Sequence, residues 1–590
     1  MRQEQKELHS NPHSNMQGNW LKTQTNAFRA RLAHADALPQ LAILGCISGF
    51  LTALIAIIFR LSFELPLGIL LPDGSESFEQ LPKYLHFLLP VIGAVVLGLI
   101  MHFTKPEHHS VSVGHVLERM QHHQAQLPAA NGIMQFIGGA IALLSGHSVG
   151  REGPAVHLGA TSSSLLGQQL KLPNNSLRTL TACGVAAAIA ASFNTPLAGV
   201  IFAMEVVLME YTITGFIPVI LSAVTGGVMS RIVFGNEPAF AIPMIELGSL
   251  WELPYLVLCG LVIGLAASAM LLLFRFTKKF NDRPVFLRLL FAGLLCGSVA
   301  VLLPQIQGVG YDTVEQALLG EMGVTLLIMI VIAKIVVTTI SIGLGVPGGI
   351  IGPNFVIGAC LGGCLGIIGG LLNPDHSSSG FYAILGMGAM MGAVLNTPLA
   401  ALIAVLELTF NPNILLPSML VIVIANITCR MLTKQNGIFA IDRDLTSYSS
   451  PVFQMLSRSG VTSLMKNNFN HHSRYLPYKM AESLLENKPE WIVIEDTGES
   501  KFILKPADLA LHLEQLKTNL TEENHTIDLR EIPGERWRLF PIHSRATLQE
   551  AQLTLRQNNG RAVFISQPAA PLMTEVAGII TQQDIDNFYQ

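Results

Sequence analysis

Two short stretches decide the fold, Gly150-Arg-Glu-Gly-Pro154 and Gly349-Ile-Ile-Gly-Pro353, which lie at a constant offset of 199 residues. Small residues follow both at matching positions, as at Gly159 and Gly358. A proline near the first helical turn, with glycines before it, is a helix-start signal that leaves backbone N–H groups free at the positive end of the helix dipole. We therefore expect two equivalent helix starts that together bind an anion; the alternative is that the glycines only allow close helix packing in lipid.

A second duplicated stretch indicates that the repeat extends over most of the apolar region. Asn194-Thr-Pro-Leu-Ala198 recurs as Asn396-Thr-Pro-Leu-Ala400, and a glutamate, Glu205 or Glu407, follows nine residues after the proline of each copy. Duplicated membrane halves with interrupted helices are typical of transporters whose site lies between the repeats near the bilayer midplane. The motifs alone leave open whether the repeats are parallel or inverted.

Charged residues are distributed unevenly along the chain. Of the 590 residues, 50% are hydrophobic and 13% are charged, whereas soluble proteins carry about 25% charged residues. Residues 441–590 contain 15 Lys/Arg and 19 Asp/Glu, an ordinary soluble composition, so the charge deficit falls on the first 440 residues. This pattern predicts a membrane domain followed by a soluble domain. A net charge of −4 without a basic stripe gives no support to nucleic acid as a partner.

Apolar runs recur from about residue 40 to about residue 432, and several are shorter than the roughly 20 residues that a spanning helix needs. Broken helices persist in a membrane only where their backbone faces protein or an aqueous cavity, so the pattern favours a permeation pathway. We expect a membrane domain over 39–445, with repeats at about 39–234 and 250–432, between an N-terminal segment (1–38) and a soluble domain (446–590).

The first 38 residues are polar, and Lys22, Arg29 and Arg31 precede the first apolar run. This composition argues against a secretory signal peptide and predicts a cytoplasmic start. We expect a multi-pass protein of a plasma membrane or a bacterial inner membrane, with both termini cytoplasmic. All seven cysteines lie in apolar segments, and Cys360 and Cys364 share a helix face where packing is favoured over metal ligation. No disulfide framework, metal or required cofactor is expected.

Glu152 is the most informative residue, because a carboxylate within a membrane span is costly and marks an ion or proton pathway by default. Its repeat equivalent is Ile351, so the backbone architecture does not itself require an acid. An ion pair with the adjacent Arg151 is the alternative, and it is disfavoured because neighbouring side chains diverge. A carboxylate at an anion site competes with the anion while ionised and yields when protonated, so Glu152 is expected to be both gate and proton acceptor.

These motifs resemble the CLC chloride channels and chloride/proton antiporters over about residues 25–445. The resemblance implies an all-α, inverted-repeat membrane fold with broken helices, a homodimer in the bilayer, and one pathway per subunit for chloride or other monovalent anions. It places Glu152 on the family's gating glutamate. The anion-binding positions that it implies are Ser112, Val113, Gly114, Gly150, Arg151, Gly153, Gly349, Ile350, Ile351 and Phe439.

Several positions depart from the family pattern. Val113 stands where an anion-contacting serine is expected, with Ser112 one residue away, and Phe439 replaces a tyrosine. At the inner proton position Val206 replaces an acid, and the preceding Glu205 is either a buried structural acid, as its repetition by Glu407 favours, or a proton relay. The departures narrowly favour a gated passive chloride channel over a chloride/proton antiporter. The proline at 154 argues against the fluoride-exporting branch.

Beyond about residue 450, short β-rich runs alternate with amphipathic helices, which predicts a small α/β regulatory module. Residues 540–590 resemble a cystathionine-β-synthase-type (CBS) domain, and 458–516 resemble a degenerate first copy. The resemblance implies an adenine nucleotide between the copies, and a structural dimer clamp is the alternative. His115, His147 and His157 remain unassigned. An intramembrane enzyme would need a paired nucleophile and base, which the apolar segments do not offer, so no enzymatic activity is expected.

Overall fold

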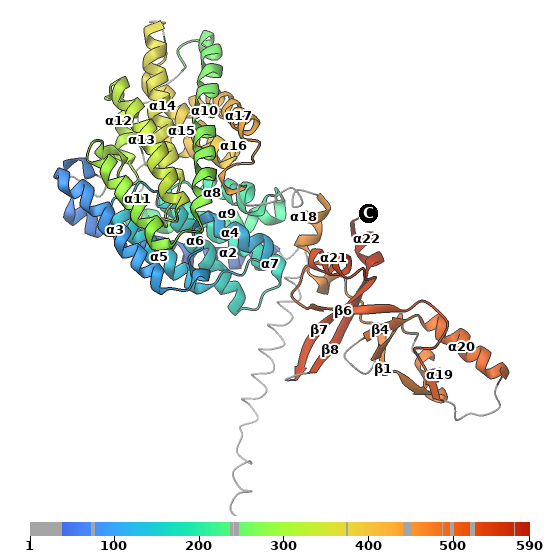
Figure 1. Cartoon of the computed structure of the whole chain (residues 1–590). Coiled ribbons are helices and arrows are strands. Elements are labelled where there is room, and N and C mark those ends of the chain that lie inside the picture. Colours follow the sequence, from blue (N-terminus) through green and yellow to red (C-terminus); the bar gives the residue numbers. More distant parts are fainter. Residues whose placement is uncertain are drawn as a thin grey trace, which may run out of the picture. The chain divides into compact units, whose positions relative to one another are not determined.

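The computed structural model describes residues 38–71, 77–235, 240, 247–372, 376–440, 451–486, 488–495, 501–519, 526–570 and 573–589. It divides into two units. One holds residues 41–170 and 177–446, and the other is built on 447–590 and also takes in the segment 171–176. The first unit is made of helices and the second of a sheet with helices (Figure 1).

The helical unit contains two successive sets of helices, which follow the duplicated motifs. The first set comprises α2 (Leu38–Leu70), α3 (Lys83–Phe103), α4 (Ser112–His122), α5 (Ala129–Leu144), α6 (Glu152–Gln169), α7 (Asn174–Phe193), α8 (Pro196–Phe202), the π-helical turn η3 (Ala203–Leu208) and α9 (Ile213–Phe234). The second comprises α10 (Leu253–Thr277), α11 (Val285–Ala300), α12 (Tyr311–Leu319), α13 (Val324–Gly343), α14 (Ile351–Leu372), α15 (Ser379–Leu395), α16 (Pro398–Thr409) and α17 (Leu415–Thr433).

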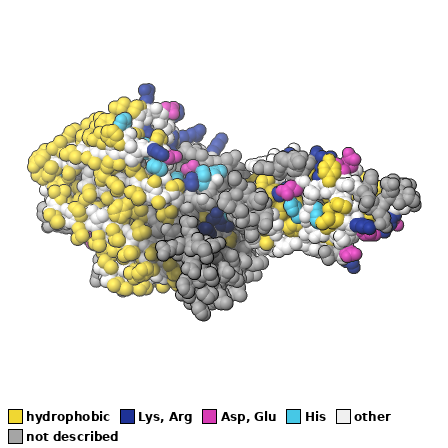
Figure 2. All heavy atoms as spheres, turned by 90° about the horizontal axis from the view of Figure 1, so that it is seen from below, with side chains coloured by type: hydrophobic (Ala, Val, Ile, Leu, Met, Phe, Trp, Pro, Cys, Tyr) yellow, Lys and Arg dark blue, Asp and Glu magenta, His cyan; other side chains and the backbone are white. Residues whose placement is uncertain are grey.

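Helix lengths bear out the prediction of a multi-span membrane domain with broken helices. Within the described residues, eight helices are long and apolar enough to cross a membrane, while α5, α11, α15 and α16 are apolar but shorter. Leucine, isoleucine, valine and phenylalanine side chains are exposed on the outer helices, and hydrophobic side chains cover much of the face of this unit in Figure 2. Such a surface suits hydrocarbon and not water, and the chain is a multi-pass membrane protein.

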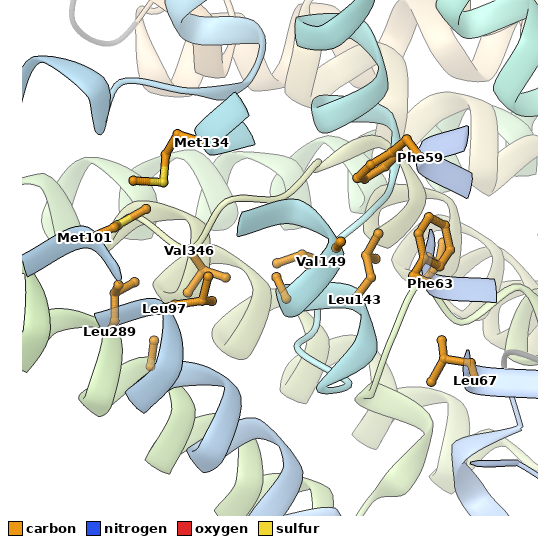
Figure 3. Close-up of a cluster of buried hydrophobic side chains, with 14 of the residues drawn as sticks. Phe59, Phe63, Leu67, Leu97, Met101, Met134, Leu143, Val149, Leu289 and Val346 are labelled. Atoms are coloured by element: carbon orange, nitrogen blue, oxygen red, sulfur yellow. The ribbon is translucent and has the colours of Figure 1, made fainter. Parts of the chain in front are cut away.

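One buried cluster lies around the two segments that lead into α6 and α14. Val149 directly precedes Gly150, and Val346 belongs to the matching segment of the second repeat. Both pack with Leu143 of α5 and with Phe59 of α2 in a single apolar cluster, which Figure 3 shows from within. Because side chains in such a core are close-packed, the cluster fixes both segments against each other.

The second unit is a six-stranded sheet in the order β1-β3-β4-β6-β7-β8. Its strands are β1 (Phe469–Ser473), β3 (Trp491–Glu495), β4 (Lys501–Leu504), β6 (Trp537–His543), β7 (Ala562–Ala570) and β8 (Met573–Thr581), with β2 (Tyr475–Pro477) paired to β5 (Thr526–Asp528) apart from them. The helices are α18 (Pro451–Arg458), α19 (Tyr478–Glu486), α20 (Pro506–Asn519), α21 (Leu548–Gln557) and α22 (Gln582–Tyr589).

The sheet consists of two similar halves. In each half the first two strands are parallel and the third is antiparallel, as in β1-β3-β4 and β6-β7-β8, and the halves join where β4 pairs antiparallel with β6. Helix α19 or α21 connects the two parallel strands of each half. The predicted α/β fold is therefore confirmed, and its strand–helix–strand–strand repeat is consistent with a CBS-like domain. The β-rich runs predicted at 491–494, 562–565 and 576–581 lie in β3, β7 and β8, whereas β1, β2, β4, β5 and β6 were not predicted.

Candidate functional site

The two predicted helix starts meet in the structure. Gly150 N donates to Gly349 O at 2.7 Å and Gly349 N donates to Gly150 O at 2.6 Å, which forms an antiparallel bridge between the repeats. Helix α6 begins two residues after Gly150, and α14 begins two residues after Gly349. The free N–H groups of both first turns are thus brought together around one point, which is the arrangement that favours an anion.

Glu152 occupies this point. Its side chain is fully buried, and its carboxylate lies next to the backbone N–H of Gly352, in the first turn of α14. The Tyr311 hydroxyl donates to Glu152 Oε1 at 3.0 Å, while Glu152 Oε2 has no hydrogen-bond partner among the described residues. A Cβ atom at Gly349 or Gly352 would stand 2.8 Å from a carboxylate oxygen of Glu152. Glycine at both positions therefore gives the carboxylate room against the second repeat.

Arg151 forms its ion pair away from the anion-binding point. Its Nη1 lies 2.9 Å from Glu64 Oε1, and Arg60 Nε lies 2.6 Å from the same oxygen. The guanidinium also stands 5.1 Å from the ring centroid of Tyr311 and 5.8 Å from that of Phe193. The side chains of Arg151 and Glu152 thus have different hydrogen-bonding partners, Glu64 for the arginine and Tyr311 for the glutamate.

A cavity of about 640 Å³ reaches the helix starts from one side. Lys278 and Arg288 give it positive charge, and His109, His122 and Glu118 add titratable groups. The predicted anion-binding residues that line it are Ser112, Val113, Gly114, Gly153, Ile350, Ile351 and Phe439. Gly150, Arg151, Glu152 and Gly349 are not among its lining residues, so the carboxylate lies beyond the end of the cavity.

Ser112, not Val113, presents a hydroxyl at this end. Ser112 begins α4 with a φ of 70°, and its N–H donates to Gln135 Oε1 at 2.5 Å. Its Oγ lies 3.3 Å from the carbonyl oxygen of Gly348, while the Val113 side chain is buried. Phe439, in the short helix η8 (Ile438–Ala440), is half-buried against the cavity and offers no hydroxyl there.

Glu205 and Glu407 have equivalent partners in opposite repeats. Glu205 accepts from the backbone N–H groups of Leu399 (3.3 Å) and Ala400 (2.9 Å), at the start of α16. Glu407 accepts from those of Leu197 (2.9 Å) and Ala198 (2.7 Å), at the start of α8. Each glutamate caps the first turn of the other repeat's helix. Val206 is buried beside Glu205 and carries no titratable group.

Two of the three unassigned histidines are in contact. His115 Nδ1 lies 2.8 Å from His157 Nε2, and the rings stack at 5.1 Å. His115 lines the cavity, while His157 is fully buried on α6, five residues after Glu152. His147 is fully buried next to the backbone of Pro90 and is not in contact with the other two.

The sequence motifs missed two residues of the site, Tyr311 and Gln135. Gln135 is fully buried and holds the first N–H of α4, and its equivalent at the offset of 199 is the buried Lys334, which donates to Val309 O at 3.2 Å. Tyr311 is the equivalent of Ser112 at the same offset. The offset pairs Tyr311 with the candidate residue Ser112, but it does not indicate that Tyr311 contacts Glu152, and no motif marks Gln135.

Comparisons with known proteins add to this geometry. A family model described as voltage gated chloride channel matches residues 92–430. A ClcB-like chloride channel protein of Ralstonia nicotianae is 31% identical over 359 residues, which are 59% of this chain and 83% of that protein. The H(+)/Cl(−) exchange transporter ClcA of Salmonella agona is 31% identical over 436 residues, which are 67% of this chain and 90% of that protein. A eukaryotic CLC transporter structure shares the fold, with a TM-score of 0.57, 17% identity, and coverage of 92% of this chain and 97% of that one.

Proposed function

The chain belongs to the CLC family, whose family model is described as voltage gated chloride channel, and on that premise we propose that it exchanges chloride for protons with Glu152 as gate and proton acceptor. The observation that carries the proposal is the position of one carboxylate. Glu152 begins α6 and is buried beside the first turn of α14, where an anion would otherwise bind. While ionised it competes with chloride for the same N–H groups, and once protonated it yields them.

Chloride in this proposal enters the cavity and reaches the helix starts at Gly153, Ile350 and Ile351. Lys278 and Arg288 attract it at the cavity wall, whereas the helix starts bind it with partial charges only. An ion that must leave again is better held by backbone N–H groups than by a full positive charge. The Ser112 hydroxyl donates to the carbonyl oxygen of Gly348 at 3.3 Å, and it would have to turn away from that oxygen before it could donate to chloride.

The alternative is a gated passive chloride channel, which the valine at 206 favours because it removes the usual inner proton acceptor. Exchange is supported by the relative named H(+)/Cl(−) exchange transporter, which matches more of this chain than the relative named as a channel protein. A proton route without an acid at 206 needs other titratable groups. His115, at the cavity, and His157, behind it on α6, are placed for such a route.

The remaining parts of the proposal concern assembly and control. We propose a homodimer in a bacterial-type inner membrane, with both termini cytoplasmic and the membrane domain over 39–445. We also propose that the two halves of the C-terminal unit bind an adenine nucleotide, on the strength of their paired strand–helix–strand–strand repeat. Isothermal titration of the full-length protein with ATP, ADP and AMP tests this, and no heat from any of them would favour the dimer-clamp alternative.

The decisive experiment records chloride and pH together outside proteoliposomes, with a chloride gradient, no initial pH gradient, and valinomycin with potassium to clamp the voltage. We expect proton movement driven uphill by the chloride gradient under the clamp. Chloride flux without coupled proton movement would instead establish the passive channel.

A further inference from the structure

Tyr311 is the one side chain whose hydroxyl contacts Glu152 in the described structure, with Tyr311 OH 3.0 Å from Oε1. It begins α12, as Ser112 begins α4, and the two positions are equivalent at the offset of 199. Ser112, from the first repeat, reaches Gly348 in the segment before α14 of the second repeat. Tyr311, from the second repeat, reaches the start of α6 in the first. Each repeat therefore sends one hydroxyl to the helix start of the other.

The ring of Tyr311 is held firmly in place. The Arg151 guanidinium stands over it at 5.1 Å, Phe240 meets it edge-on at 5.6 Å, and Phe193 lies at 6.3 Å. The Arg151 side chain is itself tied to Glu64 at 2.9 Å. Gly310, with a φ of 84°, supplies the left-handed turn that brings Tyr311 to the start of α12. A hydroxyl in such a setting keeps its direction, so the hydrogen bond to Glu152 costs little ordering.

We propose that Tyr311 is a positioning residue that latches the ionised Glu152 side chain at the helix starts and releases it when the carboxylate takes up a proton. The inference rests on the proposed role of Glu152 as gate. A hydroxyl that donates to a carboxylate makes a bond about twice as strong as one between neutral groups. Protonation of Glu152 removes the negative charge that strengthens this hydrogen bond. The bond is therefore strong while the ionised side chain blocks the anion site and weak once the side chain is protonated. Proton uptake and gate release thereby become one event.

Charged groups on several elements lie around the latch. Arg151 is on α6, and Arg60 and Glu64 are on α2. Asp312 is on α12 and interacts electrostatically with Lys334 on α13, with Glu315 on α12 and with Glu79. The substitution Tyr311→Phe leaves all of them in place and removes one oxygen atom. A changed pH profile of the variant therefore reports on the hydroxyl and not on a rearranged charge network.

The test measures chloride flux and proton uptake in proteoliposomes of the full-length protein, between pH 4.5 and 8. For Tyr311→Phe we expect the half-maximal flux to move to higher pH by about one unit, a tenfold lower proton concentration, because the ionised gate is held less tightly. Protons moved per chloride should fall, since chloride then passes without waiting for protonation. In the Glu152→Gln background, Tyr311→Phe should add no further change in pH dependence.

A matched control lies outside the pathway. Tyr382 OH donates to Glu252 at 2.6 Å, and both side chains are buried, so Tyr382→Phe removes the same kind of bond. Its pH profile should match the wild type. Glu152→Asp, which shortens the carboxylate out of reach of Tyr311, should shift the profile in the same direction as Tyr311→Phe and covers the case in which that variant does not fold. Wild-type profiles for both Tyr311→Phe and Glu152→Asp would overturn the latch, whereas a wild type without coupled protons would overturn the proposed function itself.

Discussion

The segments Gly150–Pro154 and Gly349–Pro353 share a backbone and differ in chemistry. Both start a buried helix, and their first glycines form one antiparallel bridge. The first carries Arg151 and Glu152, whereas the second carries Ile350 and Ile351 at the same positions. A duplicated scaffold that tolerates isoleucine at both positions does not need the charges to fold.

The same contrast extends to the residues that support the two segments. Gln135 and Lys334 are equivalent and both are buried, and each holds the backbone near the start of a short helix. Ser112 and Tyr311 are equivalent too, and each crosses to the other repeat. The two repeats therefore share the geometry of their helix starts, and only the first carries a titratable side chain there.

We expect the largest effect from removing the charge of Glu152, which the second segment lacks. Glu152→Gln should abolish proton movement and the pH dependence of chloride flux while chloride still passes, because the gate can no longer change its charge. Paired chloride and pH recordings in proteoliposomes measure both. Ile351→Val is the control at the equivalent position, and it should keep the wild-type pH dependence because it changes no titratable group. Unchanged pH dependence of the Glu152→Gln variant would remove Glu152 from its role.

The equivalent glycines Gly153 and Gly352 provide a second test of how the two segments differ. A Cβ at Gly153 would stand 2.7 Å from Gly349 Cα and 2.8 Å from Gly348 O, both backbone atoms, whereas at Gly352 it would meet the side chains of Glu152 and Val309. We expect Gly153→Ala to destabilise the protein by about 3 kcal/mol and Gly352→Ala by about 1 kcal/mol, because side chains can move aside.

Thermal unfolding in detergent at fixed chloride concentration compares these two glycine variants. Adding Glu152→Ala should recover part of the loss in Gly352→Ala, since one of the two crowded side chains is then removed, and should recover none in Gly153→Ala. Equal losses for the two glycine variants would mean that the helix starts are more adaptable than their close approach indicates.

The capping glutamates Glu205 and Glu407 test positions at which the two repeats carry the same residue. Glu205→Gln and Glu407→Gln should each cost about 1 kcal/mol of stability, since each weakens hydrogen bonds to two backbone N–H groups. Neither should change the number of protons moved per chloride. A fall in that ratio for Glu205→Gln alone would instead place Glu205 on the proton route and break the equivalence.

The smallest expected effect is a change in the stability of the C-terminal unit with pH, which has to be distinguished from the pH response of the gate. Two hydrogen-bonding nitrogens of Arg474 lie within 3.0 Å of Asp528 oxygens and hold the pKa of that carboxyl below its usual range. The pair therefore stabilises this unit above the unfolded pKa of about 3.9, and the contribution is lost as the pH falls through the lower folded value.

Because the pair is partly exposed, we expect a loss of only about 0.5–1 kcal/mol, confined to pH values below about 4. Hydrogen exchange of β2 and β5 across that range measures it, and Asp528→Asn should abolish the change. A response of these strands between pH 5 and 7 would show that another group titrates there, and the flux profiles of the gate variants would then need correction for it.

Much of the fold followed from patterns that are local in the chain. Helix starts at Glu152 and Ile351 were predictable because glycine and proline act within one turn, and the membrane unit because its charge deficit is spread over 440 residues. Strand β1 was not predicted because Phe469-Asn-His-His-Ser473 has no alternation of apolar and polar residues. Its place in the sheet comes from pairing with β3.

The site was predictable only as far as its motifs extended. Gly150, Gly153, Gly349, Ile350 and Ile351 lie around the meeting point of the helix starts, as their repeat indicated. The partners of Arg151 and Glu152 were not predictable, because Glu64 and Tyr311 lie 87 and 159 residues away in the sequence. Long-range pairs of this kind depend on how α2 and α12 pack, which no local pattern records.

The exchanged caps of Glu205 and Glu407 have a consequence for how the chain is made. The backbone N–H groups that Glu205 caps lie 194 and 195 residues later in the chain. At 5 to 20 residues per second, a ribosome needs about 10 to 40 s to reach them. During that time Glu205 lacks the N–H groups that it caps, and the first N–H groups of α8 lack Glu407. An uncapped polar helix end is costly in lipid. The first half therefore lacks these hydrogen bonds until the second half has been made.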